Sequence, residues 1–444
     1  MATYHVVTYG CQMNKNDSER IVTIMQGAGF VLHEDETADV IILNTCSVRK
    51  SAEDRVYGLV KKLHEQRMNG KTGQIICVTG CMAGRDRNHK LQEKMPGADL
   101  FFPIADITLL PQRISQLRAD LVSNAEVVDD YLTIAPQRKH TVSAFVTIQT
   151  GCNKFCTYCV VPFARGFERN RTLREILDEV HDLVAHGCIE ITLLGQTVNS
   201  YRASDPQHFS KDNPYHDHFA ALLWELNQVD GIARIHFTAP HPLSLTVEGI
   251  EALTLPKHVK FLHLPVQAGN DEVLRRMNRR YSRQLYIDLV KQIYVRNPDI
   301  ALGTDIIVGF PGETREQFED TVSLYRECQF DISYTAMYSA RTGTVAHKGF
   351  LDDVSRDEKK ERFEILQKLM KEIVLEKNQR FIGRTVSVLV DTFIAKEDGF
   401  GWCEGNSEHM KRVRCIGTSD MVGTLVNVVV SKAQEWMLYG MRVK

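Results

Sequence analysis

The chain has 444 residues, of which 43% are hydrophobic and 25% charged, with a formal net charge of −2. This length predicts two to four domains. A net charge this close to zero does not attract nucleic acid to the protein as a whole. Any contact with nucleic acid must therefore come from local basic patches. No apolar run approaches the ~18 residues of a membrane span, and the start lacks signal-peptide features. We expect a cytoplasmic protein without a membrane partner, whose eleven cysteines serve metal binding or catalysis.

Three short β-branched segments in the first third of the chain predict buried strands at 5–10, 39–45 and 74–80. Helical patterns follow the first two, at 18–28 after the capping residues Asn16 and Asp17, and at 52–66. Strands that alternate with helices predict a parallel α/β sheet.

A cysteine stands directly after each of these strands. Cys11, Cys46 and Cys81 are separated by 35 residues and then by 35 again. Because the carboxyl ends of parallel strands form the ligand crevice of such a sheet, the three thiols are expected to converge on a metal cluster. The alternative is a set of structural thiols, which is how we interpret the remaining cysteines, Cys77, Cys188, Cys328, Cys403 and Cys415.

The alternation of strands and helices restarts near residue 138. The expected strands are 143–151, 190–195, 233–239, 258–266, 301–309 and 331–338. The expected helices include 173–186, 219–228, 283–295 and 315–329. Six such repeats predict a partial (βα)₆ barrel, a relative of the full eight-stranded barrel.

Three cysteines follow the first strand of this series. Cys152, Cys156 and Cys159 have the spacing C-x₃-C-x₂-C, which can ligate three irons of a 4Fe–4S cube and leave the fourth iron open. The alternative is a zinc knuckle or a set of buried thiols. Zinc usually takes a fourth Cys or His at short range, and residues 166–180 contain none.

Glycine, amide and carboxylate residues follow three other strands of the series, on the face where barrel active sites lie. Glycine lets the backbone approach a ligand closely, and the polar side chains can hydrogen-bond it. The candidate ligand contacts are Gly195, Gln196, Asn199, Gln267, Asp305 and Gly309.

A helical stretch at 357–380 leads into short strands at 385–393, 409–416 and 423–430, which predict a small β-barrel. Basic residues cluster here and after the cysteine triplet, and cationic faces attract RNA phosphates. The candidate RNA contacts are Arg165, Arg169, Arg171, Lys411, Arg412 and Arg414. A charge run is also typical of a merely solvated face, and the basic stretch 275–280 fits the polar side of a helix.

The chain resembles the radical S-adenosylmethionine (SAM) methylthiotransferases over essentially its full length. The matching motifs are YGCQMN (9–14), NTCSVR (44–49), GCMA (80–83), the cysteine triplet, VPFARG (161–166), DIIVGFPGE (305–313) and YSARTGT (338–344). The resemblance implies an α/β protein with three domains. They are an N-terminal methylthiotransferase α/β domain at 1–137, a radical SAM partial barrel at 138–378 and a TRAM-like RNA-binding β-barrel at 379–444.

The resemblance also implies the cofactors. These are SAM and two 4Fe–4S clusters, one on the cysteine triplet and an auxiliary one on Cys11, Cys46 and Cys81. The candidate ligand contacts listed above would hold SAM. No catalytic residue beyond the cluster ligands is implied. Ala268, Asn270 and the pair Phe163-Ala164 depart from the usual pattern, so contacts by those side chains do not follow.

Within the family, the start GCQMN is similar to the branch that acts on isopentenyladenosine next to the tRNA anticodon. The implied activity is radical SAM sulfur transfer, which adds a methylthio group to carbon 2 of that base. SAM would be both radical source and methyl donor, and the auxiliary cluster the sulfur carrier. The implied partners are the tRNA anticodon stem–loop and a reducing donor such as flavodoxin or ferredoxin. The sulfur donor does not follow.

Three alternatives stay open. The substrate within the family could be threonylcarbamoyladenosine in tRNA or an aspartate of a ribosomal protein. The alternative from another class is a non-catalytic iron–sulfur sensor that binds RNA.

Overall fold

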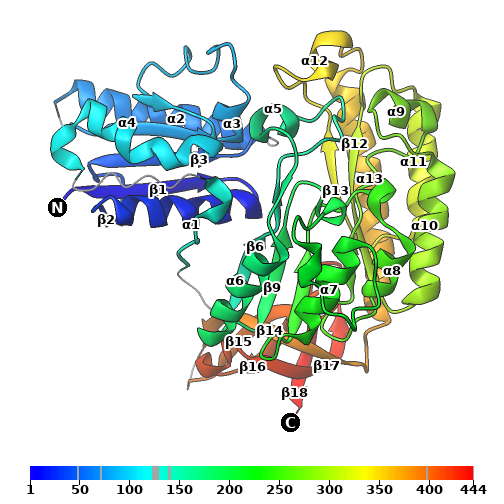
Figure 1. Ribbon diagram of the computed structural model, residues 1–444. Coiled ribbons are helices and arrows are strands. Elements are labelled where there is room, and N and C mark those ends of the chain that lie inside the picture. The colour runs from blue at the N-terminus through cyan, green and yellow to red at the C-terminus, as the bar shows by residue number, and fades with distance from the viewer. Residues whose placement is uncertain (48–49, 71–72, 123–129, 139–141, 397–398, 444) are drawn as a thin grey trace.

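The computed structural model describes residues 1–47, 50–70, 73–122, 130–138, 142–396 and 399–443. Val48 and Arg49 of the NTCSVR motif therefore lie outside the described residues. Figure 1 shows an amino-terminal sheet beside a larger array of strands and helices, with a small barrel of strands below that array. No helix among the described residues has both the length and the apolar character that crossing a membrane requires.

The amino-terminal sheet is parallel throughout and has the strand order β2-β1-β3-β4-β5, as expected of an α/β sheet. Its strands are β1 (Thr3–Tyr9), β2 (Val31–Leu32), β3 (Val40–Thr45), β4 (Ile75–Gly80) and β5 (Leu100–Phe101). Its helices are α1 (Gln12–Gly27), α2 (Lys50–Met68), α3 (Cys81–Gly84) and α4 (Leu110–Leu117). The two-residue edge strands β2 and β5 were not predicted, because they are too short to show a period.

Helix α1 begins six residues earlier than the sequence predicts. Cys11 is its N-cap, whereas Asn16 and Asp17 are buried within the helix and cap nothing. Both were interpreted as caps because Asn and Asp favour that position. Their partners lie instead in the neighbouring part of the chain, and Asn16 Oδ1 accepts a hydrogen bond from Thr147 at 2.8 Å.

The middle of the chain forms a six-stranded half-barrel, as predicted. Two parallel three-stranded sheets, β10-β9-β6 and β11-β12-β13, are linked by a bridge between Ile235 and His258. The strands are β6 (Ser143–Thr147), β9 (Glu190–Leu194), β10 (Arg234–Phe237), β11 (Phe261–His263), β12 (Ala301–Val308) and β13 (Ile332–Met337). Strand β11 is shorter than predicted; Pro265, which has no N–H to donate to a ladder, lies just beyond its end.

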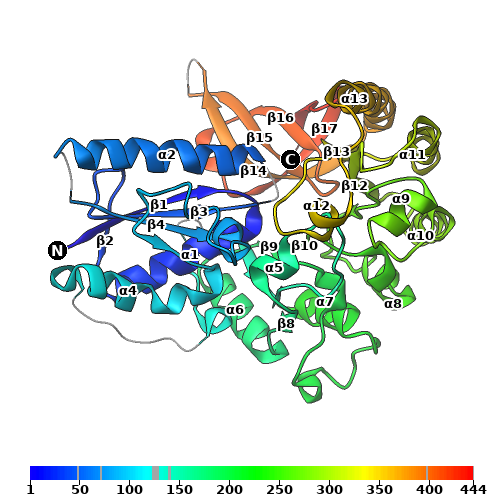
Figure 2. The ribbon, with the colours of Figure 1, turned by 90° about the horizontal axis from the view of Figure 1, so that it is seen from above.

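Helices cover the outside of the half-barrel, as the view from above shows (Figure 2). The main ones are α6 (Leu173–Ala185), α7 (His218–Gln228), α8 (Val247–Ala252), α10 (Arg283–Arg296), α11 (Arg315–Cys328) and α13 (Arg356–Gln379). Shorter elements at the carboxyl face are β7 (Gln149–Thr150), α5 (Val161–Arg165), β8 (Arg169–Asn170), α9 (Asp271–Arg276) and α12 (Val345–Gly349).

The last part of the chain is a closed barrel with the strand order β14-β15-β16-β18-β17, as predicted for a small barrel. Its strands are β14 (Thr385–Ala395), β15 (Gly401–Ser407), β16 (Arg412–Gly417), β17 (Leu425–Ala433) and β18 (Leu438–Val443). The sequence did not predict β15 and β18, because glycines and polar residues interrupt their apolar pattern.

This small barrel packs against the amino-terminal end of the half-barrel, away from the loops that follow the strands. Four of its half-barrel partners stand at or just before the start of a strand, and they are Arg234, Lys260, Asp299 and Asp331. Asp331 is buried and pairs with Lys411 of the small barrel at 2.9 Å and with Lys377 of α13 at 2.5 Å. The small barrel therefore closes the half-barrel at the end opposite the cysteine triplet.

Candidate active site

Three cysteines meet at the carboxyl ends of β1, β3 and β4. Cys11 caps α1, Cys46 directly follows β3, and Cys81 begins α3. A hydrogen bond to Cys46 is the main cause that lowers the pKa of the Cys11 thiol to about 6. Burial raises the pKa of Cys81, which lies close enough to Cys11 to interact with it electrostatically. The structure thus brings together the thiols that the 35-residue spacing predicted, and their binding of a cluster stays a prediction.

Two buried asparagines and two glycines shape these loops. The side-chain amide of Asn14 donates to Asn44 Oδ1 at 3.1 Å, and that of Asn44 donates to the Asn14 carbonyl at 2.8 Å. A Cβ at Gly10 would lie 2.2 Å from Asn14 Oδ1, and one at Gly80, where φ is +94°, would lie 2.4 Å from the Thr45 carbonyl. Only glycine allows this approach. No role for these residues is visible in the sequence, because a hydrogen bond between a helix and a distant strand leaves no periodic signal.

Arg165 connects the two sets of cysteines. It ends α5, which begins two residues after Cys159. Its Nε donates to Cys81 Sγ at 3.4 Å, and its Nη2 donates to Asp17 Oδ2 at 2.5 Å. The Arg165 and Asp17 side chains are 1% and 0% exposed, and the Tyr131 hydroxyl donates to the same carboxylate. The prediction that Arg165 contacts RNA does not fit this buried position.

A second contact between the two parts runs through Arg85, just after α3. Arg85 pairs with Glu53 at 2.8 Å, and both side chains are less than one-tenth exposed. Its guanidinium also donates to the Ser47 hydroxyl and, at 2.8 Å, to the Thr342 carbonyl. Thr342 belongs to the YSARTGT motif, so this motif lies beside the loop that carries Cys46.

The cysteine triplet forms a tight loop after β7. The backbone N–H of Lys154 donates to Cys152 Sγ at 3.5 Å, and that of Val161 donates to Cys159 Sγ at 3.4 Å. Burial raises the pKa of both thiols. A bound cation such as iron would oppose this effect and favour their thiolate forms.

The basic stretch 275–280 forms a support for this loop. The Asn278 side chain donates to the backbone carbonyl of Phe155 at 2.9 Å. Arg279 Nη1 donates to Cys156 Sγ at 3.4 Å. From sequence this stretch fits the polar side of a helix, because its distant partner Cys156 is not visible there.

The donor set fits an iron–sulfur cluster better than a single zinc ion. Zinc binds its thiolates at about 2.3 Å from one centre, whereas a four-iron cube takes each thiolate on a separate iron. Within the described part of the chain, no three His, Cys, Asp or Glu side chains converge as a single metal ion requires. Each sulfur of the triplet accepts a hydrogen bond from an N–H group. Hydrogen bonds of this kind stabilise the thiolates that hold a cluster.

Several candidate SAM contacts hold the loops of the carboxyl face together. Asn199 is 4% exposed and bonds the His241 backbone through both amide atoms, at 2.8 and 2.9 Å. Gln267, with φ +74°, donates its N–H to the Asp305 carbonyl at 2.8 Å. The Asp305 carboxylate lies 3.2 Å from His263 Nε2.

The other candidate SAM contacts are two glycines and a glutamine whose side chain is half-buried. A Cβ at Gly195 would lie 2.9 Å from Val198, and one at Gly309 would lie 2.3 Å from the Lys359 side chain. Gln196 is half-buried and follows Gly195 in the same loop. Contact of these six residues with SAM stays a prediction, with Asn199 the least available of them.

The remaining candidate RNA contacts are largely neutralised by carboxylates. Arg171 is buried against Glu179, and Lys411 against Asp331. Arg169 is 54% exposed and pairs with Asp130. Arg412 and Arg414 are both about three-tenths exposed and share Glu404. The positions of Arg171 and Lys411 do not fit RNA contact, and for Arg169, Arg412 and Arg414 it stays a prediction.

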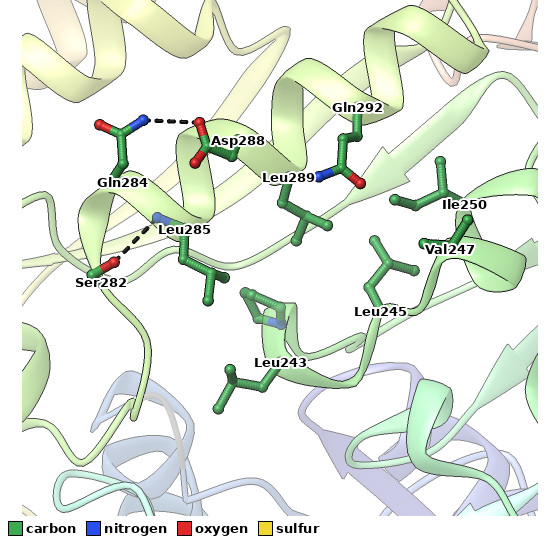
Figure 3. A pocket seen from close by; sticks show the side chains of 11 residues that line it. Leu243, Leu245, Val247, Ile250, Ser282, Gln284, Leu285, Asp288, Leu289 and Gln292 are labelled. Carbon is green, nitrogen blue, oxygen red and sulfur yellow. Dashed lines mark hydrogen bonds between the residues drawn. The ribbon is translucent and has the colours of Figure 1, made fainter.

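A surface groove of about 590 Å³ lies between α8 and α10 (Figure 3). Its lining is mainly aliphatic, including Leu243, Leu245, Val247 and Leu285. None of the predicted site residues lines it, so the candidate site is defined by the cysteine loops.

Sequence comparison agrees with this arrangement. Residues 3–103 match the uncharacterized protein family UPF0004, and residues 146–325 match the radical SAM superfamily. Two proteins named tRNA-2-methylthio-N(6)-dimethylallyladenosine synthase, from Caldicellulosiruptor saccharolyticus and Clostridium botulinum strain Okra, are each 40% identical to the chain. The alignments cover 99% and 98% of this chain and 92% and 96% of the relatives. The chain belongs to this family.

Membership makes the protein a radical SAM tRNA methylthiotransferase that uses SAM and an iron–sulfur cluster. The resemblance found in the sequence motifs is therefore confirmed, and the alternative of a non-catalytic sensor has no support.

Solved structures agree on the fold. The radical SAM methyltransferase TsrM from Kitasatospora setae, with cobalamin and a [4Fe-4S] cluster bound, superposes with a TM-score of 0.54 at 12% identity. That superposition covers 78% of this chain and 74% of TsrM. The cobalamin-dependent radical enzyme OxsB gives 0.52 at 12% identity, over 85% of this chain and 56% of OxsB.

Proposed function

We propose that this methylthiotransferase adds a methylthio group to carbon 2 of isopentenyladenosine next to the tRNA anticodon. The apposition of two sets of three cysteines supports the sulfur-transfer chemistry, and the names of the two relatives that are 40% identical support this adenosine as the substrate. Arg165, six residues beyond Cys159, reaches Cys81 of the other set at 3.4 Å. A substrate base between them would have a radical source on one side and a sulfur carrier on the other.

The two sets have separate roles in this proposal. Cys152, Cys156 and Cys159 hold the cluster that binds SAM, and Cys11, Cys46 and Cys81 hold an auxiliary 4Fe–4S cluster. When bound, these groups supply the radical, the sulfur and the methyl group, which no protein side chain can provide.

The protein's own residues position these groups and exclude water. Asn14 and Asn44 fix the loops of the auxiliary set, and Asn278 fixes the loop of the triplet. The pair of Arg165 and Asp17 holds the two crevices together. No general acid or base is needed, because the hydrogen is removed as an atom.

The tRNA partner requires an RNA surface, and the outer face of the small barrel supports one. Trp402 of β15 carries Lys396 over its ring at 4.2 Å, and Arg414 lies near both Trp402 and Tyr439. Aromatic rings flanked by cations stack nucleobases and attract phosphates. This face replaces Lys411 as the candidate contact.

A low-potential protein such as flavodoxin or ferredoxin is the proposed electron donor, and the protein is proposed to act in the cytoplasm. The proposed domains are the three implied by the resemblance, at 1–137, 138–378 and 379–444.

The test is turnover of reduced, anaerobically reconstituted protein with SAM and synthetic anticodon stem–loops. One RNA carries isopentenyladenosine and the matched control carries threonylcarbamoyladenosine. We expect mass spectrometry of nucleosides to find the methylthio product from the first RNA alone. Product from the second RNA, or from a ribosomal-protein aspartate and neither RNA, would refute the assigned substrate.

A further inference from the structure

Arg279 is a buried cation whose side-chain partners are all uncharged groups or the triplet thiol. The residue is 5% exposed. Its Nη1 donates to Cys156 Sγ at 3.4 Å, its Nη2 to the Pro265 carbonyl at 3.0 Å and its Nε to the Tyr281 hydroxyl at 2.9 Å. Among the described residues, no carboxylate forms an ion pair with it. An uncompensated buried cation is strongly unfavourable, so a negative charge beside it is to be expected.

Arg165 provides the contrast. It too is buried and donates to a cysteine sulfur at 3.4 Å, that of Cys81. The Asp17 carboxylate at 2.5 Å neutralises it. The two arginines that donate to cysteine sulfurs therefore differ. Arg279 has no carboxylate partner, whereas Arg165 is neutralised by Asp17.

We infer that Arg279 raises the reduction potential of the cluster held by Cys152, Cys156 and Cys159. Reduction adds one electron, taken from a low-potential one-electron donor, and so adds one negative charge to the cluster. A fixed cation stabilises that reduced state more than the oxidised state. Net charge, burial and hydrogen bonds to sulfur are the factors by which a protein sets a cluster's potential, and Arg279 contributes to all three.

The consequence is selective delivery of the electron. A donor that reaches the protein reduces the triplet's cluster more readily because Arg279 lies against it. Arg165 adds no comparable charge at Cys81, because Asp17 neutralises it. Arg279 is thus a positioning and tuning residue for the proposed chemistry, and this inference rests on the proposed cluster sites.

The test is a redox titration followed by electron paramagnetic resonance. It uses the full chain with Cys11, Cys46 and Cys81 changed to alanine, so that one cluster gives the signal. In this background, Arg279→Gln should lower the equilibrium constant for one-electron reduction tenfold or more, and each factor of ten is about 59 mV. Arg279→Lys keeps the charge and should stay within about threefold of the parent, by the same conversion.

Arg296→Gln is the control, because Arg296 is a half-exposed arginine at the end of α10 whose partner is Glu251. It should leave the potential unchanged. An iron-loaded Arg279→Gln protein with the parent potential would overturn the inference. If Arg279→Gln loses its iron, retention in Arg279→Lys supports the charge role and loss in both contradicts it. A parent protein without iron would refute the proposed cluster site itself, which is a distinguishable failure.

Discussion

Arg165 and Asp17 form a buried ion pair at 2.5 Å between two parts of the chain that have separate hydrophobic cores. Asp17 belongs to α1, which Cys11 caps, and Arg165 belongs to α5, which follows the triplet. The pair therefore fixes the distance between the two sets of cysteines. In the proposed mechanism that distance decides whether one base can reach both clusters.

Breaking this pair should destabilise the association of the two parts. Arg165→Ala leaves the Asp17 carboxylate buried and unpaired, which costs about 3–5 kcal/mol. We expect the free energy of unfolding of the amino-terminal sheet, measured in urea, to fall by the same amount. Arg169→Ala is the control, because Arg169 is exposed and its pair with Asp130 contributes about 1 kcal/mol or less. Equal losses in the two variants would contradict the interpretation of the pair.

Packing of α3 on α5 should depend on Gly84. A Cβ at this position would lie 2.3 Å from the Ala164 carbonyl oxygen, which is backbone and cannot move aside. Gly84→Ala should therefore cost about 1–3 kcal/mol of stability and lower the iron bound by Cys81. Gly58→Ala lies on exposed α2 with no atom near its Cβ, and it should gain about 0.5–1 kcal/mol. Thermal unfolding and iron analysis of both variants check this, and normal iron binding by Gly84→Ala would be evidence against it.

Attachment of the small barrel should weaken in acid through Asp299. Burial alone would raise the pKa of this carboxyl, but hydrogen bonds from Arg384 and His409 outweigh it and lower the pKa to about 2. Because the folded-state pKa is below the ordinary value, the stabilisation is complete above about pH 4 and is lost as the pH falls towards 2. The difference in stability between the parent and Asp299→Asn should be constant from pH 5 to 7 and shrink below pH 4. A difference that does not change with pH would contradict this role.

The outer face of the small barrel should bind tRNA through its aromatic rings. Trp402→Ala and Tyr439→Ala should each weaken tRNA binding by about 1–3 kcal/mol, measured by fluorescence anisotropy. Reductive cleavage of SAM without RNA should not change, because this barrel lies at the far end of the half-barrel. Trp224→Ala on α7 serves as the control and should bind normally. Unaltered affinity in both barrel variants would exclude this face.

Most strands could be located from sequence, because apolar runs and the residues that end them are local. The meeting of Cys11, Cys46 and Cys81 followed from the same rule, since each stands at the end of a parallel strand. The partners of charged residues could not be predicted in this way. Asp17 resembled a helix cap and Lys411 an exposed cation, yet each is buried against a charge far away in sequence.

The missed supports of the site share one property. Asn14, Asn44, Arg279 and Asn278 all act through side-chain hydrogen bonds to residues distant in sequence. Such bonds have no period and no fixed spacing, so composition and pattern do not reveal them. Asn14 and Asn44 belong to motifs that carried the family resemblance. Those motifs do not show which side chains these two residues contact.

The central claim is that one set of cysteines generates the radical and the other carries the sulfur. The most direct measurement uses the full chain with Cys11, Cys46 and Cys81 changed to alanine. The variant is assayed for 5′-deoxyadenosine and for methylthiolated isopentenyladenosine in the same reaction. We predict that 5′-deoxyadenosine still forms, because the triplet keeps its ligands, and that the methylthio nucleoside is absent. Continued formation of the methylthio nucleoside would show that the amino-terminal cysteines are structural and would contradict the account.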